Sequence, residues 1–157
     1  MPIASSRTRR TPAQIYLRLC DLGIDPDNPP DSAKSQYEMG GAMMPLLLDK
    51  LDAGTTNVIC GMRVSEPVRF IDISLAHRFE QNGDLCADPD MEIRIYPDRG
   101  MCEALSFSQD LSIVGPIYQR VYSDDGRGYS KKLMKDLNSF LLSWLRNTIL
   151  QNHKLDH

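Results

Sequence analysis

The chain has 157 residues, a length typical of one domain with its own hydrophobic core rather than of a two-domain enzyme. Its 41% hydrophobic and 25% charged residues match globular proteins, which excludes collagen-like, coiled-coil and wholly disordered chains. The formal net charge of −3 gives no overall attraction to nucleic acid or to an anionic membrane, so any such contact has to be local.

Residues 1–10 differ from the rest of the chain in charge and predict a flexible basic arm. Arg7, Arg9 and Arg10 lie in this arm, which contains no acidic residue and no apolar periodicity. Residues 11–157 then form a single domain. The sequence has neither a secretory signal pattern nor an apolar run long enough to span a membrane, so we expect a cytoplasmic protein.

Two helical segments are predicted next. Thr11 is a suitable N-cap, Pro12 suits the first turn, and apolar residues recur at helical spacing until Gly23 ends the helix. The proline-rich segment 25–30 is a loop. Apolar residues over 32–52 share one helical face, although glycines and a proline interrupt them, which predicts a kinked helix or two short ones.

Alternating apolar and polar residues then predict strands. A short strand is expected over 57–64 and a long one over 68–79. Residues 91–96 also alternate, residues 101–105 begin another strand, and the segment 97–100, with its proline and glycine, joins the two as a β-hairpin.

The pattern becomes helical again near the end of the chain. Residues 113–122 are ambiguous, and 124–128 form a turn. From Ser130 a wide apolar stripe predicts a long amphipathic helix packed on the sheet. The predicted class is α+β, with N-terminal helices, an antiparallel β-meander of about four strands and a long C-terminal helix.

The hairpin MEIRIYPDRGMCEAL and the later segment LNSFLLSWL resemble the YqiB-like family of uncharacterised proteobacterial proteins over residues 91–152. That family has a similar M-x-V-R-L-Y-x-D-x-x-x-A-E-V hairpin and a closing L-N-x-F-L-x-x-W-L helix. Pro97 stands where the family commonly has His, and an M-H-Q-x-D-E-K stretch before the last helix is replaced at 127–132. The resemblance implies a bacterial cytoplasmic α+β protein, and no activity.

The cysteines are the candidate nucleophiles for a catalytic site. Cys20, Cys60, Cys86 and Cys102 form no C-x-x-C pair, so we expect reduced thiols, no bound metal and no cofactor. A small enzyme would need Cys60 or Cys102 beside His77, whereas ordinary strand residues are the simpler interpretation. No common hydrolase, nucleotide-binding or metalloprotease motif occurs, which favours a protein that is not an enzyme.

Two further patterns resemble metal sites without matching one. His153 and His157 have i, i+4 spacing but lack a third ligand. Five carboxylates lie within thirteen residues and could bind a hard cation, but the order of a calcium loop is absent and a solvated turn has the same composition. These residues are Glu80, Asp84, Asp88, Asp90 and Glu92.

A candidate anion site begins the last helix. Cations at a helix N-terminus oppose the macrodipole, so their presence there favours a binding role over a purely structural one. The exposed N–H groups of the first turn would bind a phosphate or a carboxylate. The competing interpretation is that Asp124 and Asp125 pair with the lysines. The candidate residues are Arg127, Ser130, Lys131 and Lys132.

These patterns favour a non-catalytic protein that acts through protein contacts. Its partner is either another protein or a second copy, as a homodimer formed by a sheet edge or by apolar surface near Met39, Met43 and Met44, although filling the core is the commoner use of methionine. The alternative is nucleic-acid or anion binding through the basic arm and the start of the last helix.

Overall fold

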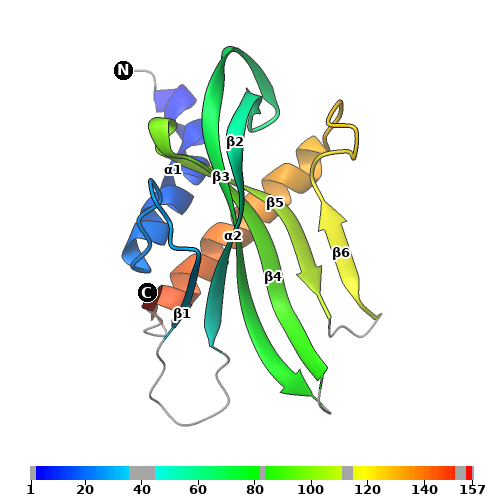
Figure 1. Ribbon diagram of the computed structural model, residues 1–157. Helices are drawn as coiled ribbons and strands as arrows, with labels where there is room; N and C mark the ends of the chain where they lie inside the picture. The colour runs from blue at the N-terminus through cyan, green and yellow to red at the C-terminus, as the bar shows by residue number, and fades with distance from the viewer. Residues whose placement is uncertain (1–2, 36–44, 82–83, 111–114, 151–154, 157) are drawn as a thin grey trace.

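The computed structural model describes residues 3–35, 45–81, 84–110, 115–150 and 155–156 (Figure 1). The elements along these residues are α1 (Ile3–Asp21), β1 (Ser32–Ser35), β2 (Leu46–Ile59), β3 (Met62–Gln81), β4 (Asp84–Tyr96), the 3-10 turn η1 (Pro97–Arg99), β5 (Met101–Gln109), β6 (Ile117–Arg120), α2 (Lys131–Leu150) and β7 (Leu155–Asp156). The strands form one sheet in the order β6-β5-β4-β3-β2-β1-β7. Every neighbouring pair is antiparallel.

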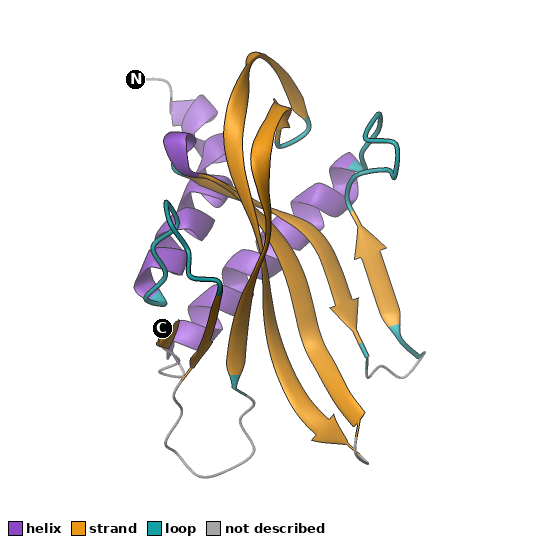
Figure 2. Ribbon diagram, viewed as in Figure 1, coloured by secondary structure: helices purple, strands orange, loops and turns teal. Residues whose placement is uncertain are grey.

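Both helices cover the same face of the sheet, and the core lies between them and the strands (Figure 2). Period-2 alternation sends Ile71, Ile73 and Leu75 of β3 to this face, where each is at most 5% exposed. Leu141 and Leu145 of α2 are fully buried against it. Burial of each of these leucines contributes about 1.5–3 kcal/mol, so α2 is a main source of core stability.

The first helix begins earlier than the sequence pattern predicts. It starts at Ile3 instead of Thr11 and includes Pro12 in its interior, so residues 3–10 are helical in the structure. Ile15 and Leu19 on this helix are fully buried. The buried face that the periodicity predicted is confirmed, whereas the predicted start is wrong because the cap residues at Thr11 lie within a longer helix.

The predicted second helix is wrong, and strands replace it. Residues 32–35 form β1, and 46–59 form the first arm of a long hairpin. Leu46 and Leu48 are buried while Leu47 and Asp49 are less so, which is the alternation of a strand. The apolar residues of this segment fit a helical period and a strand period alike, and pairing with β3 stabilises the strand. Met39, Met43 and Met44 lie outside the described residues.

The four-strand meander is also an underestimate, since the described strands form a seven-stranded sheet. The expected strand over 57–64 spans a turn, because Ile59 pairs with Met62 across the two-residue loop Cys60–Gly61. The predicted hairpin at 91–105 is confirmed, with Tyr96 paired to Met101, and the last helix is confirmed as α2. The class remains α+β.

The tip of the β2–β3 hairpin curls over the face of the sheet opposite to the helices (Figure 1). A small second cluster lies beneath it, in which Ile59, Val68 and Phe70 contact Tyr96 of β4. The hairpin therefore covers one end of this face. Neither α1 nor α2 is long and apolar enough to cross a membrane.

Candidate binding face of the sheet

Polar side chains form rows across the face opposite to the helices, because residues paired across antiparallel strands point the same way. One row joins Asp72 of β3, Arg94 of β4 and Glu103 of β5, under the hairpin tip. We call this part of the sheet the covered end. Two further rows lie beyond it along the strands.

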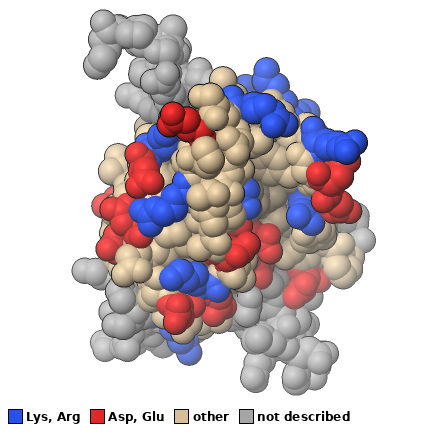
Figure 3. All heavy atoms as spheres, turned by 45° about the horizontal axis from the view of Figure 1, so that its top comes forward, with Lys and Arg blue, Asp and Glu red and all other residues tan. Residues whose placement is uncertain are grey.

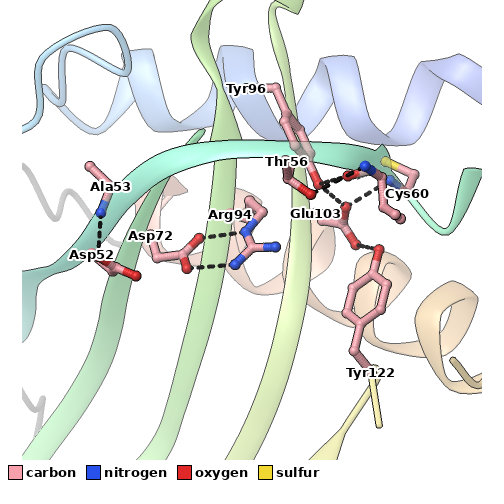
Figure 4. Close-up of polar contacts among 10 residues, drawn as sticks. Asp52, Ala53, Thr56, Cys60, Asp72, Arg94, Tyr96, Glu103 and Tyr122 are labelled. Atoms are coloured by element: carbon pink, nitrogen blue, oxygen red, sulfur yellow. Dashed lines mark hydrogen bonds and ion pairs between the residues drawn. The ribbon is translucent and has the colours of Figure 1, made fainter. Parts of the chain in front are cut away.

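At the covered end, Glu103 is fully buried and its carboxylate has three donors (Figure 4). The Cys60 backbone N–H and the Tyr96 hydroxyl donate to Oε2 over 2.8 and 2.5 Å, and the Tyr122 hydroxyl donates to Oε1 over 2.7 Å. Tyr122 in turn accepts a hydrogen bond from the Gly61 N–H at 2.9 Å. A buried carboxylate is costly unless it is hydrogen-bonded, so this network stabilises both the charge and the turn.

The turn itself requires an unusual backbone. Cys60 has φ of 49° and Gly61 has φ of 77°, as a two-residue type I′ hairpin loop demands. A Cβ at Gly61 would lie 2.5 Å from the ring of Tyr129. The ring therefore packs directly on the glycine backbone, and the turn is held from both sides.

The protonation states at this end suit a structural role. Burial, together with the negative charge of Glu103, raises the pKa of the Cys60 thiol well above its ordinary value. The same two causes raise the pKa of Tyr96 and of Tyr122. All three groups remain protonated near neutral pH, so none of them is an activated nucleophile or base.

Arg94 extends the same row with a paired charge. Its Nε and Nη2 donate to the two carboxylate oxygens of Asp72 over 2.8 and 2.9 Å, and its guanidinium carbon lies 4.1 Å from the centre of the Phe70 ring. Burial is the largest single cause and acts to lower the pKa of Arg94, but the hydrogen bonds to Asp72 and the nearby negative charges, that of Asp72 first, together outweigh it and raise that pKa. The polar groups of the covered end satisfy one another.

Beyond the covered end, the same face has a hollow of about 170 Å³. One row across it pairs Asp49 of β2, Ser74 of β3, Glu92 of β4 and Ser106 of β5. The next row pairs Asp90, Ser108 and Tyr118. The lining residues are Asp49, Leu51, Ser74, Asp90, Glu92, Ser106, Ser108 and Tyr118.

Several polar groups of the hollow lack partners. The Ser74 hydroxyl donates to Asp90 over 2.7 Å. Asp49 and Glu92, by contrast, have no ion pair or hydrogen bond from their side chains within the described part of the chain. Ser106 is 3% exposed, lines the hollow, and its hydroxyl is also without a partner among these residues. The hollow thus offers acceptors to a cationic donor.

The volume of the hollow and the residues around it limit the kinds of ligand that it can hold. Pockets for cofactors and other small molecules usually measure about 300–1,000 Å³, so 170 Å³ suits a side-chain head group better. No group of three His, Cys, Asp or Glu residues among those described is placed to hold a metal ion. Exposed apolar side chains flank the hollow, since Leu51 is 50% and Tyr118 is 64% exposed.

The candidate anion-binding residues lie elsewhere, at the start of α2. Ser130 acts as the N-cap, because its hydroxyl accepts the Leu133 N–H at 3.2 Å. Lys132 pairs with Asp136 over 3.3 Å on the exposed helix surface. Arg127 and Lys131 are exposed as well. Anion binding there stays a prediction.

The alternative pairing of Asp124 and Asp125 with the lysines is not observed. Asp125 accepts the Arg127 N–H at 3.0 Å and the Ser123 hydroxyl at 2.7 Å, and the Arg127 N–H is the first cause that lowers the pKa of this carboxyl. Asp124 pairs with Arg120 over 3.3 Å. Asp125 is thus paired within the turn and Asp124 with the end of β6, and neither carboxylate pairs with Lys131 or Lys132.

Arg7, Arg9 and Arg10 lie in the first turns of α1, and their side chains are not described, so their contact with nucleic acid stays a prediction. Figure 3 brings the hairpin tip forward, and on that face basic and acidic side chains are interspersed. Neither sign forms an extended patch there, whereas nucleic-acid surfaces usually concentrate positive charge.

The structure does not bring His77 beside either candidate thiol, Cys60 or Cys102. Cys102 is in register with Ile71, six residues along β3 from His77, which corresponds to roughly 20 Å. Burial raises the pKa of the Cys102 thiol, and Cys60 lies at the far tip of the hairpin. His77 packs edge-on against Trp144 at 5.4 Å in the core. His153 and His157 lie outside the described residues.

Sequence reasoning singled out Asp90 and Glu92, but it missed the rest of the hollow. Asp49 was assigned to a helix, and Ser106 and Ser108 were passed over. The available signal was period-2 polarity, because Ser106 and Ser108 alternate with apolar neighbours as Asp90 and Glu92 do. Only the strand pairing shows that these alternations share one face.

Comparison with known proteins gives a family and no activity. The chain matches a family described as a domain of unknown function, DUF6908, over residues 34–154. Because this match covers most of the chain, the protein belongs to that family. No curated protein and no solved structure matches it. The resemblance to the YqiB-like family is not tested by this match and stays a prediction.

Proposed function

We propose that this protein is a non-catalytic binding protein that contacts a basic partner protein through the face of the sheet opposite to the helices. The observation that carries the proposal is the hollow, in which the Asp49 and Glu92 carboxylates have no cationic partner among the described residues. Exposed Leu51 and Tyr118 beside it add the apolar contact that protein interfaces use. A positive partner surface complements this combination.

The sheet face suits such a contact better than the sheet edges do. The strand β6 at one edge has four residues, and β7 at the other edge has two. Short edge strands are a common protection against edge-to-edge pairing. A homodimer remains one outcome of the test below, which would show it as an adduct of twice the chain mass.

The proposed location is the cytoplasm. Among the described cysteines, Cys20, Cys60 and Cys102 are free thiols. Free thiols, including an exposed one at Cys20, are typical of reducing compartments.

Site-specific photocrosslinking in the native cells tests the proposal. A benzophenone amino acid replaces Tyr118 at the hollow or, in a matched control, Leu17, which is 52% exposed on α1 at the helical side. We expect a discrete protein adduct from position 118 that is absent from position 17 and weakens at high salt. The adduct should also weaken in the Asp49→Asn, Glu92→Gln background.

Equal adducts from both positions, or an adduct from position 118 that does not respond to salt or to the two substitutions, would overturn the proposal. Circular dichroism of each variant establishes that the fold is intact. Because neither carboxylate has a partner in the described structure, the two substitutions should leave folding unchanged.

A further inference from the structure

We infer that the hollow receives the guanidinium group of an arginine side chain supplied by the partner protein. The inference rests on the proposed function and specifies the group that is recognised. It follows from the spacing of the acceptors, from a serine hydroxyl that opens into the hollow without a partner among the described residues, and from the aromatic ring at the rim.

The spacing of the acceptors favours a broad, planar donor. Asp49 and Glu92 lie on β2 and β4, with Ser74 of β3 between them in the same row. Two strand spacings separate the two carboxylate positions by roughly 10 Å. A guanidinium has five N–H donors in a fixed plane and can serve acceptors on more than one side, whereas an ammonium is a compact point charge.

Ser106 supplies an independent indication of a ligand. It is 3% exposed, lines the hollow and has no hydrogen-bond partner in the described part of the chain. Its hydroxyl is not among the enclosed polar atoms, so it opens into the hollow, where it is available to a donor or acceptor from outside. A guanidinium N–H beside Glu92 would satisfy it, since these two residues are directly paired.

The rim accounts for the remainder of an arginine side chain. Tyr118 is 64% exposed and lines the hollow next to Ser108, so its ring is accessible to a side chain that enters the hollow. Guanidinium groups stack on aromatic faces, and their aliphatic stems pack on apolar side chains such as Leu51. Arg94 already makes a contact of this kind with Phe70 at the covered end of the same face.

The direct test is a titration of the full chain, labelled with ¹⁵N, with N-acetyl-arginine amide. N-acetyl-citrulline amide is the matched neutral probe, and N-acetyl-lysine amide is the matched ammonium probe. We expect saturable amide shifts at Ser74, Glu92, Ser106 and Ser108 with arginine. Citrulline should give none, and lysine should bind roughly tenfold more weakly because it makes fewer hydrogen bonds.

Variants of the chain locate the binding. Glu92→Gln should weaken arginine binding roughly tenfold, since it removes one charge-assisted hydrogen bond. Ser106→Ala should weaken it less. Glu66→Gln, which removes an equal charge from an exposed position near the hairpin tip, is the control and should leave arginine binding unchanged.

The outcomes separate this inference from the proposed function. Equal binding of lysine and arginine, binding of citrulline, or an equal effect of Glu66→Gln and Glu92→Gln overturns the guanidinium site. If cross-links from position 118 persist in such a case, the contact face stands and only its ligand is wrong. If arginine binds as expected and the cross-links are absent, the proposed protein contact fails instead.

Discussion

Glu103 and Glu92 lie on the same face of the sheet, on neighbouring strands, and differ in almost every physical respect. Glu103 is fully buried and accepts three hydrogen bonds at the covered end, whereas Glu92 is partly exposed in the hollow and accepts none in the described structure. The chemical group is the same. What differs is whether the fold itself supplies donors.

On this one face of the sheet, the covered end therefore has a structural role and the hollow has the proposed binding role. At the covered end, both carboxylate oxygens of Glu103 accept hydrogen bonds from the protein itself, so little capacity for a ligand is left there. In the hollow, acceptors remain exposed or unpartnered, a state that natural proteins retain where a ligand or partner completes it. Four predictions test this division, beginning with the largest effect.

The first compares identical substitutions at the two glutamates. Glu103→Leu removes the acceptor from Tyr96, from Tyr122 and from the Cys60 N–H, so we expect the free energy of unfolding to fall by roughly 3–5 kcal/mol. Glu92→Leu should change it by less than about 0.5 kcal/mol. Urea denaturation measures both. Comparable losses at the two positions would remove the distinction between them.

The second tests how closely the hairpin tip is packed. Gly61→Ala introduces a Cβ against the Tyr129 ring at positive φ, while Gly126→Ala introduces one at a similar φ of 71° with nothing within 4 Å. The backbone cost of about 1–2 kcal/mol is common to both. We expect an additional loss of about 1–3 kcal/mol at Gly61 alone, measured by urea denaturation. Equal losses would mean that Tyr129 moves away freely.

The third concerns alkaline pH. The pKa values of Tyr96 and Tyr122 are raised in the folded state by burial and by Glu103, so above pH about 10 the unfolded chain loses these protons while the folded protein holds them. Stability is therefore complete below pH about 10 and falls as pH rises, by about 1.4 kcal/mol per pH unit for each tyrosine. Denaturation from pH 9 to 11 should show a shallower fall in Tyr122→Phe than in the unsubstituted protein, and an equal fall would contradict the prediction.

The fourth and smallest effect is in the hollow. Asp49→Asn combined with Glu92→Gln should raise the free energy of unfolding by a few tenths of a kcal/mol at low salt, because it relieves repulsion among carboxylates. The gain should vanish at about 1 M salt. Denaturation midpoints at both salt concentrations measure it. A clear loss of stability would show that these carboxylates serve the fold, which the covered end alone is expected to do.

Local patterns predicted several elements correctly. The hairpin at 91–105 could be predicted because an alternating segment, 91–96, leads into a turn that contains a proline and a glycine. The helix α2 could be predicted because its apolar stripe is long. The segment 32–52 was misassigned because its apolar residues satisfy a helical and a strand period at once. Pairing between Leu46 and His77, thirty-one positions apart, settles it, and no local signal reports such a partner.

The candidate sites divide in the same way. Asp90 and Glu92 were candidate ligands for a cation because they are close together in the sequence. The cations around Ser130 were candidate anion-binding residues for the same reason. Asp49 and Ser106 lie in the same row as Glu92 across the sheet, but each comes from a different strand and neither is close to Glu92 in the sequence. A surface built from one residue per strand cannot be predicted from the sequence until the order and register of the strands are known.

By itself the sequence determined the α+β class, the β4–β5 hairpin, the buried face of α1 and the amphipathic α2, because each depends on periodicity within one segment. The tertiary structure decided which carboxylate is buried with donors and which is left open. Cross-strand register places Glu103 beneath the curled hairpin tip and Glu92 beyond it. Burial and hydrogen-bond partners are properties of that register and not of residue type, which is why two glutamates eleven positions apart have opposite roles.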